Sequence, residues 1–417
     1  MVEPAANLMK WVNTLSTRPS LEAAVEEVTQ RAQQLLGGPA DLGLVFISST
    51  FTSEYPRLLP LLNERLAIPH LVGCGGGGVI GTSLQDQTQE VEGEPALSLT
   101  LARLPGVKIQ TFDLSIDELP DLDSPPDAWI ELIGVSPADQ PQFILLADPI
   151  PAKINDLLEG LDFAYPGSVK VGGLASNGSS LANSGLFCNQ KLYREGIVGV
   201  ALSGNIVLET IVAQGCRPIG EPYRIAEAER NIVLKLQPDS PIGSGTLSPV
   251  QTPLEVLQDL VQDLSEQDQA LAQHSLFVGV VRNEFKQDLE QGDFLIRNLL
   301  GIDPKVGAIA IGDRIRPGQR IQFHLRDAHT SAEDLEMLLQ RHQKSLQETS
   351  SAGALLFSCM GRGQGLYGHP DFDSQLFNRY LRDIPLSGFF CNGEIGPVGG
   401  ATCLHGYTSA FGIFRPV

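Results

Sequence analysis

A glycine-rich turn at residues 388–400 (GFFCNGEIGPVGG) constrains the fold of this chain more than any other stretch. An aromatic strand runs there directly into a turn that carries one carboxylate and one proline. Glycine adopts positive φ angles and lets the backbone approach a ligand or another strand closely. Similar turns follow apolar strands at residues 72–78 and 171–178. Three such turns predict a fold of repeated units, with a pocket where the turns converge.

Length and charge limit the classes of protein to consider. A chain of 417 residues is too long for one ordinary core, so two domains are expected. Its 42% hydrophobic and 19% charged residues are typical of a well-packed globular protein. The net charge of −20 repels nucleic acid and anionic membrane surfaces, and no basic cluster offsets it. We therefore expect neither as a partner.

The six cysteines are scattered and form no CxxC pair, which argues against a disulfide framework and against a zinc site. The N-terminus lacks the basic region and apolar run of a signal peptide. No apolar stretch approaches the ~20 residues that a membrane-spanning helix needs. These features predict a protein of the cytoplasm.

Three copies of one β-α-β order precede the glycine turns. In each copy a strand, a helix and a second strand span about 30 residues, the size of one β-α-β unit. Hairpins are expected at residues 97–112 and 197–212. The copies comprise strands at 42–48, 143–147 and 354–358, helices at 56–66, 154–163 and 372–381, and glycine-ended strands reaching 78, 173 and 400.

Another strand and helix precede the first copy. Residues 11–15 are expected to form a strand, and Ser20 to cap a helix with apolar residues at helical spacing up to residue 35. The same order recurs at residues 321–346. Residues 237–253 are rich in Pro, Gly, Ser and Thr, which indicates a linker. We predict a two-domain α/β protein with mixed sheets, divided into residues 1–237 and 238–417.

The sequence 73–78 formally satisfies the dinucleotide motif G-x-G-x-x-G. A dinucleotide site also needs a helix directly after the motif, and residues 79–89 lack helical periodicity. No P-loop motif and no metal-ligand spacing is present. We therefore expect neither a cofactor nor a metal.

Cys74, Cys359 and Cys391 each end a buried strand beside a glycine turn. His405 lies downstream of Cys391 and would be available to activate a thiolate. The simpler interpretation is that these cysteines are small buried hydrophobes, because no nucleophile elbow accompanies them.

Two charged residues stand in separate glycine turns. Arg362 suits bidentate capture of a carboxylate or phosphate, and Glu394 suits an ammonium group. Together they match the zwitterion of an amino acid, or they pair with each other. Ser176 and Asn177 form a turn that offers polar contacts. The candidate ligand site comprises Arg362, Asn392, Glu394, Gly393, Cys359, Cys391, His405, Cys74, Gly75, Ser176 and Asn177.

These motifs resemble the FIST domain family. The resemblance rests on the turn after Val72, the pair at 172–173, the stretch 215–220 (GCRPIG), the loop 359–362 (CMGR) and above all 388–397 with Gly-Glu-Ile-Gly-Pro. It covers an N-terminal part at about 40–235 and a C-terminal part at about 236–403. It implies an intracellular sensory role with a small ligand such as an amino acid. Neither an F-box nor a fused signalling module is expected here, so a separate, unidentified protein partner would receive the signal.

Two alternatives to a sensor remain open from the sequence. One is an acyl- or amide-transfer enzyme that uses Cys391 or Cys74 with His405. The other is an interaction scaffold without a ligand.

Overall fold

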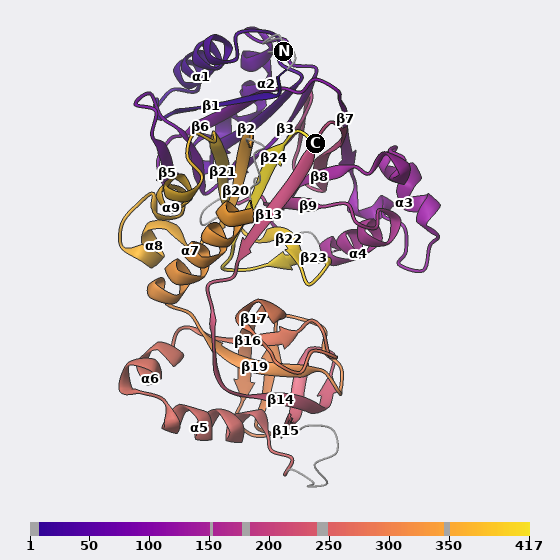
Figure 1. Cartoon of the computed structure of the whole chain (residues 1–417), viewed down its shortest axis with the longest axis vertical. Coiled ribbons are helices and arrows are strands. Elements are labelled where there is room, and N and C mark those ends of the chain that lie inside the picture. Colours follow the sequence, from indigo (N-terminus) through magenta and orange to yellow (C-terminus); the bar gives the residue numbers. More distant parts are fainter. Residues whose placement is uncertain (1–7, 151–152, 177–183, 240–248, 346–350) are drawn as a thin grey trace. The chain divides into compact units, whose positions relative to one another are not determined.

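The computed structural model describes residues 8–150, 153–176, 184–239, 249–345 and 351–417. The chain forms two compact units (Figure 1). Unit 1 contains residues 1–213 and 336–417, and unit 2 contains residues 214–335. Unit 1 therefore includes both ends of the chain, and the compact units do not follow the expected division at residue 238.

Unit 1 consists of three successive repeats. The first contains β1 (Lys10–Ser16), α1 (Leu21–Leu36), β2 (Leu42–Ser48), η2 (Ser49–Glu54), α2 (Tyr55–Asn63), β3 (His70–Gly76), β4 (Gly78–Thr82), β5 (Thr88–Glu92) and β6 (Leu97–Arg103). The second contains β7 (Val107–Leu114), η3 (Ile116–Glu118), α3 (Pro126–Ile133), η4 (Pro137–Asp139), β8 (Gln142–Ala147), α4 (Ile154–Ala164), β9 (Lys170–Leu174), β10 (Leu186–Cys188), β11 (Lys191–Tyr193) and β12 (Ile197–Gly204).

The third repeat has the same order but is interrupted after its first strand by unit 2. It contains β13 (Val207–Ala213), α7 (Ala328–Ser345, of which residues 328–335 fall in unit 2), β20 (Gly353–Cys359), α8 (Gly363–Tyr367), α9 (Phe372–Tyr380), β21 (Leu386–Cys391), β22 (Glu394–Val398), β23 (Ala401–His405) and β24 (Ser409–Arg415). The strand at 321–325 belongs to unit 2, so it is β13 that corresponds to β1.

Each repeat contributes a hairpin to the sheet of the preceding repeat, and the first contributes its hairpin to the third sheet. The first sheet has the order β1-β6-β2-β3-β10-β11, the second β23-β22-β9-β8-β12-β7 and the third β13-β24-β20-β21-β4-β5. In every sheet the two central strands are parallel and the others antiparallel, which confirms mixed sheets. The hairpins β4–β5, β10–β11 and β22–β23 each follow a glycine turn that carries the chain from one sheet to another.

The mixed α/β fold with repeated β-α-β units is thus confirmed, but the two hairpins expected at 97–112 and 197–212 are wrong. β6 lies in the first sheet and β7 in the second, while β12 lies in the second and β13 in the third. The two linking turns lie side by side, since Asn205 donates its backbone N–H to the carbonyl of Gly106 at 3.0 Å. Each of these turns carries the chain from one sheet to another, and neither joins two neighbouring strands of the same sheet.

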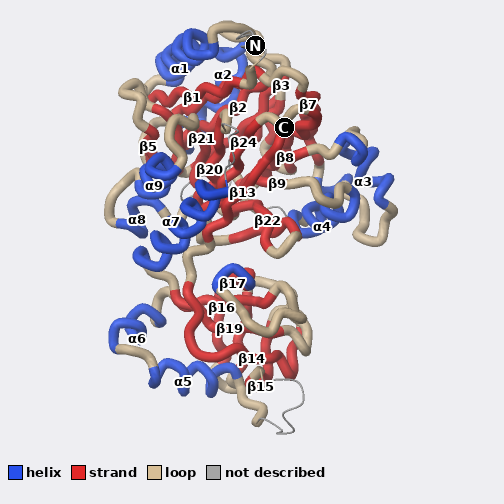
Figure 2. Tube along the Cα trace, in the orientation of Figure 1, coloured by secondary structure: helices blue, strands red, loops and turns tan. Residues whose placement is uncertain are grey.

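Three sheets enclose one central core, and helices cover their outer faces (Figures 1 and 2). The central core includes Phe46, Leu146 and Phe357, one from the middle of each sheet. Outer cores lie beneath α1 and α2 on the first sheet and beneath α3 and α4 on the second. On the third, Phe377 of α9 stacks on Phe411 of β24 with ring centroids 5.3 Å apart.

Helix α1 shows how local sequence sets these elements. The side chain of Ser20 accepts from the N–H of Ala23, and Gly37 ends the helix in the left-handed conformation at φ 69°. Leu21, Val25 and Val28 are buried against the first sheet because they recur at helical spacing. The N-cap, apolar stripe and C-cap agree with the sequence prediction.

Unit 2 is a closed barrel of strands with two helices beside it (Figure 2). Its order is β14-β15-β18-β17-β16-β19, and its core contains Val278, Phe323 and Leu325. The elements are β14 (Arg217–Glu229), β15 (Ile232–Pro238), α5 (Pro253–Asp263), α6 (Glu266–Ala272), β16 (Leu276–Val281), η5 (Gln291–Asp293), β17 (Phe294–Asp303), β18 (Ala308–Ile311) and β19 (Arg320–Leu325). Most of the expected linker, residues 240–248, lies outside the described residues. Among the helices that the structure describes, none is long and apolar enough to cross a bilayer.

Candidate functional site

The three glycine turns meet in space. The N–H of Gly77 in the first turn donates to Oγ of Ser176 in the second at 2.8 Å. The hydroxyl of Ser176 donates in turn to the carbonyl of Phe390 in the third. Ser176 therefore joins all three repeats through one side chain that is only 3% exposed.

Further hydrogen bonds at this junction join backbone to backbone. The carbonyl of Gly75 accepts from the N–H of Ser176 at 3.2 Å, and that of Gly393 accepts from Leu174 at 2.8 Å. Asn177, another expected ligand residue, lies outside the described residues. Gly75, Gly393 and Ser176 thus hold the junction together in this structure.

Equivalent glycines allow the central strands to lie close. Gly73, Gly172 and Gly388 pair in register with Val45, Leu145 and Leu356 respectively. A Cβ on any of these three glycines would lie within 2.0 Å of the paired residue's carbonyl oxygen. Close strand packing therefore requires these glycines, whatever ligand the protein binds.

The candidate cysteines are buried in the central junction. Cys359 and Cys391 are register partners on β20 and β21, and Cys74 belongs to the same core. Burial raises the pKa of the Cys74 thiol well above its usual range. Burial does the same for Cys391, and the charge of Glu394 adds to it. A raised pKa disfavours the thiolate, so the geometry gives no support to a cysteine nucleophile.

His405 and Glu394 face each other as register partners on β23 and β22. Nε2 of His405 lies 3.0 Å from the carbonyl oxygen of Gly396, and a carboxylate oxygen of Glu394 accepts from the N–H of Thr408 at 3.1 Å. Both side chains are at most 3% exposed. These contacts anchor the turn that leads from β21 into the second sheet.

Arg362 pairs with Asp373 and not with Glu394. Its Nε and Nη2 donate to the two carboxylate oxygens of Asp373 at 2.8 and 2.9 Å. Ser409 and Tyr367 also donate to Asp373, at 2.5 and 3.1 Å. Burial alone would raise the pKa of Asp373, but the charge and hydrogen bonds of Arg362 hold it below its usual range. Arg362 is 0% exposed, so this geometry assigns it to the interior of the third repeat.

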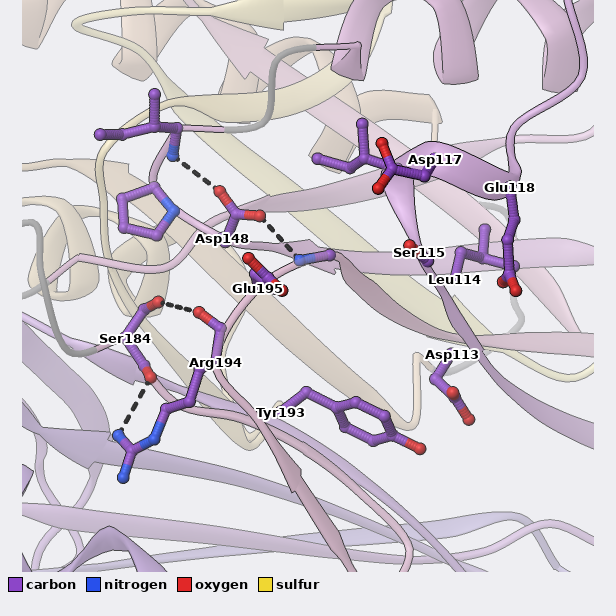
Figure 3. A pocket seen from close by; sticks show the side chains of 14 residues that line it. Asp113, Leu114, Ser115, Asp117, Glu118, Asp148, Ser184, Tyr193, Arg194 and Glu195 are labelled. Atoms are coloured by element: carbon purple, nitrogen blue, oxygen red, sulfur yellow. Dashed lines mark hydrogen bonds between the residues drawn. The ribbon is translucent and has the colours of Figure 1, made fainter.

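A cavity of about 470 Å³ lies at the carboxyl end of β8 in the second sheet (Figure 3). It is lined by residues 113–118, 148–150 and 193–196 together with Ser184. Its volume is in the range of small-molecule sites, and the carboxyl ends of parallel strands are where α/β sheets bind ligands. We call it the second-sheet cavity.

The position of the second-sheet cavity follows from the repeats. Strands β7 and β8 end at this edge and the antiparallel β12 begins there, directly after Gly196. Asn392, which follows β21, donates its side-chain N–H to the carbonyl of Pro149 on the cavity wall at 3.0 Å. Of the expected ligand residues, Asn392 is thus bonded to a residue that lines the cavity.

Asp148 is fixed at the cavity wall. One carboxylate oxygen accepts from the N–H of Ile150 at 2.9 Å and the other from Gly196 at 2.8 Å (Figure 3). Asp148 directly follows β8, at the position equivalent to Ser48 and Cys359, which end the corresponding strands β2 and β20.

The charged groups in the second-sheet cavity are separated. In Figure 3, Arg194 and Ser184 lie on one side, Asp117 and Glu118 lie on the other, and Asp148 is between them. Nη1 of Arg194 donates to the carbonyl of Ser184 at 3.2 Å. Arg194 also lines a neighbouring hollow with Thr50, Thr52 and Ser53. A ligand with charges of both signs suits this arrangement.

The sequence predictions missed this cavity. Its residues come from three separate segments and carry no motif. One signal was available: residues 109–152 contain nine Asp or Glu and no Lys or Arg. In the part of the chain that the structure describes, no cluster of His, Cys, Asp or Glu is suited to a metal ion, and all six cysteines are buried.

Comparisons with known proteins cover nearly the whole chain. A family model of the FIST N domain matches residues 41–237, and one of the FIST C domain matches residues 253–397. The gap between these matches contains the boundary expected near residue 238.

Two relatives and one solved structure are similar to the chain. The uncharacterized protein Rv0628c of Mycobacterium tuberculosis is 34% identical over 401 residues, which cover 96% of this chain and 98% of the relative. The F-box/LRR-repeat protein At5g63520 of Arabidopsis thaliana is 23% identical over 93% of this chain and 80% of its own length. A cyanuric acid hydrolase from A. caulinodans aligns over 98% of this chain and 99% of its own, with a TM-score of 0.33 and 10% identity, values too low to support an inference.

Proposed function

Since the chain belongs to the FIST family, we propose that it is a sensory protein that binds a small zwitterionic metabolite of the amino-acid class in the second-sheet cavity. FIST domains are generally regarded as small-ligand sensory domains of signalling proteins. The proposal moves the ligand from Arg362 and Glu394, which are buried in other contacts, to Arg194 and the carboxylates opposite it.

The separation of charges in the cavity supports this proposal most. The guanidinium of Arg194 is exposed at one side and offers a planar pair of donors to a carboxylate. Asp148 and Glu195 line the same cavity and offer acceptors to an ammonium group. An α-amino acid carries both groups on one carbon, so it can contact both sets of residues at once.

We further propose that a separate protein receives the signal. The match to the mycobacterial relative covers 98% of that protein, which leaves little of its chain for a fused signalling module. The six cysteines are scattered along the chain without a CxxC pair, which fits a reducing compartment, and we place the sensor in the cytoplasm.

A thermal-shift panel of amino acids, nucleotides and common metabolites tests the binding step. A ligand at 100 times its dissociation constant should stabilise the protein by about 2.7 kcal/mol. The melting temperature should therefore rise by several degrees for one class of amino acids.

The location is tested with Arg194→Gln. Arg194 is exposed, so the substitution should leave the unliganded melting temperature nearly unchanged while removing the response to the ligand. Arg382→Gln changes an exposed arginine away from the cavity and should keep the full response. A response that survives Arg194→Gln would refute the cavity as the site, and a panel without any response to amino acids would refute the ligand class.

A further inference from the structure

We infer that the ligand carries a second cationic group, as a basic amino acid does; this inference rests on the proposed function. An amino acid with a neutral side chain has no net charge at pH 7. The second-sheet cavity, in contrast, has a large excess of negative charge.

The lining of the cavity contains five carboxylates and one guanidinium. The carboxylates are Asp113, Asp117, Glu118, Asp148 and Glu195, and the guanidinium is that of Arg194. None of the five forms an ion pair with any lysine, arginine or histidine that the structure describes. Residues 151–152 and 177–183, which lie outside the described residues, contain no lysine, arginine or histidine either. A zwitterion would balance itself and leave the excess unchanged.

The excess of negative charge is energetically most unfavourable at Asp148. Asp148 is 7% exposed, and in the described part of the chain its carboxylate accepts from two backbone N–H groups. Buried charges in proteins are usually paired with an opposite charge, because desolvation penalises an isolated ion. A carboxylate that is buried at the wall of a cavity, without a cation of the protein beside it, fits the α-ammonium of the ligand, which leaves Asp113, Asp117 and Glu118 to a second cation.

Tyr193 adds an aromatic surface to the same wall. Burial and the neighbouring Asp113 raise the pKa of Tyr193, so its ring remains a neutral phenol at neutral pH. Aromatic faces attract cations, and a cation between a phenol ring and carboxylates gains from both. Neutral or anionic side chains would gain nothing from Asp113.

The surrounding chain extends the negative field beyond the cavity. Residues 109–152, which supply two of the lining segments, have nine acidic residues and no Lys or Arg. A concave surface lined by one sign of charge raises the local concentration of ions of the opposite sign. The field therefore favours entry of a cation from solution.

The geometry assigns one group of the ligand to each part of the cavity. The α-carboxylate contacts Arg194, and the α-ammonium contacts Asp148 and Glu195. The cationic side chain extends past Tyr193 and Asp113 toward Asp117 and Glu118, which lie opposite Arg194 in Figure 3. Lysine, ornithine and arginine share this chemistry.

Calorimetric titration of the full chain with L-lysine, L-norleucine and cadaverine tests the inference. Norleucine keeps the carbon chain of lysine without the side-chain ammonium, and cadaverine keeps both amines without the carboxylate. Lysine should bind at least about tenfold more tightly than norleucine, since a hydrogen bond to a charged group is lost in the neutral analogue. Cadaverine should also bind more weakly than lysine, because nothing contacts Arg194.

Variants test whether Asp117 and Glu118 cause the preference for lysine over norleucine. The double substitution Asp117→Asn and Glu118→Gln should bring lysine close to norleucine. The matched pair Asp121→Asn and Asp123→Asn removes two exposed charges of the same segment outside the lining and should leave the ratio unchanged.

The outcomes separate the inference from the proposed function. If norleucine binds as tightly as lysine, the inference is wrong and the amino-acid sensor stands. If cadaverine binds as tightly as lysine, the ligand is a diamine, which overturns the basic amino acid. If the wild-type chain binds none of the neutral or basic amino acids, the proposed function fails as well. The comparison of lysine, norleucine and cadaverine on the wild-type chain tests the inference even if a double variant does not fold.

Discussion

The pair of Arg362 and Asp373 explains how a charged residue can occupy a loop of glycines. Both side chains are at most 1% exposed, and Ser358 and Ser409 surround the carboxylate with further hydrogen bonds. The glycines at 361 and 363 let the chain turn inward there, since Gly363 has a φ of 61° and Glu92 occupies the place of a side chain. The guanidinium is therefore a structural group of the third repeat.

Replacing Arg362 should lower the stability of the folded protein. Arg362→Ala leaves the carboxylate of Asp373 buried and unpaired, a change that costs about 3–5 kcal/mol. Urea denaturation should show this loss in the free energy of unfolding. Arg382→Ala removes an exposed arginine and should change it by less than about 0.5 kcal/mol. Equal stability of the two variants would contradict the structural role.

The strand glycines give a second prediction at this scale. A Cβ on Gly172 would lie 1.8 Å from the carbonyl oxygen of Leu145, so Gly172→Ala should destabilise the fold by more than about 4 kcal/mol or yield insoluble protein. Gly365→Ala is the control, because nothing lies within 4 Å of its added Cβ and the residue is in α8. Soluble yield and melting temperature measure both. A stable Gly172→Ala variant would refute the close packing of β8 and β9.

At the scale of elements, Glu90 links the hairpin β4–β5, which pairs with the third sheet, to α9 by hydrogen bonds. One carboxylate oxygen of Glu90 accepts from the N–H of Ser374 at 2.6 Å, and the backbone N–H of Glu90 donates to Asp371 at 2.6 Å. The residue is 4% exposed. Burial, together with the charge of Asp373, raises the pKa of Glu90 from 4.5 to about 8.

This raised pKa should make the protein less stable toward alkaline pH. The folded state retains a proton that the unfolded chain releases near pH 4.5, so the full stabilisation exists below that pH and is lost as the pH rises through about 8. The free energy of unfolding should fall by up to about 1.4 kcal/mol per pH unit in this window. Denaturation of wild type and Glu90→Gln between pH 5 and pH 8.5 measures it.

Glu90→Gln keeps the shape and stays neutral, so its stability should lack this slope. Glu26→Gln changes an exposed glutamate of α1 and should keep the wild-type slope. The same slope in Glu90→Gln would show that Glu90 carries no extra proton in the folded state.

Elements were predictable from sequence where the signal is local. The cap residues Ser20 and Gly37 and the helical spacing between them mark α1 without knowledge of its neighbours. The pairing of strands is different, because a strand shows the same alternation whichever strand it contacts. The turns at 105–106 and 203–205 indicated hairpins, yet the flanking strands pair across repeats, which only the packing of the three sheets determines.

The candidate site was predictable only in part, for the same reason. Converging glycine turns were expected, and Ser176 does join them. Arg362 was assigned to a ligand because its partner Asp373 is separated from it by a loop and a helix start, and sequence does not show that the two meet. The cavity depends on residues 113–118 and 193–196, which come together only when β7 and β12 pair.

At the scale of the whole molecule, three repeats share one core and the third contains an inserted barrel. The connection from the first strand to the first helix takes residues 17–20 in the first repeat and 115–125 in the second, but 214–327 in the third. The barrel has its own apolar core around Val278, Ile321 and Phe323. The repeats and the barrel therefore each bury apolar surface independently.

Removal of the barrel should leave the three repeats folded. We expect a chain in which a short Gly-Ser linker replaces residues 215–327 to keep a cooperative thermal transition and its near-ultraviolet circular dichroism. Ligand binding should also remain, because the second-sheet cavity is lined only by residues of unit 1. A molten or insoluble product would show that the repeats depend on the insertion.

Hydrogen–deuterium exchange of the full chain with and without L-lysine tests whether the ligand binds in the second-sheet cavity. If the ligand binds in the second-sheet cavity, slowed exchange should concentrate at residues 113–118 and 193–196, and Arg194→Gln should abolish it. Slowed exchange around Arg362 and Glu394 or in the barrel, with none at the cavity, would contradict the account. So would an exchange pattern that no amino acid changes.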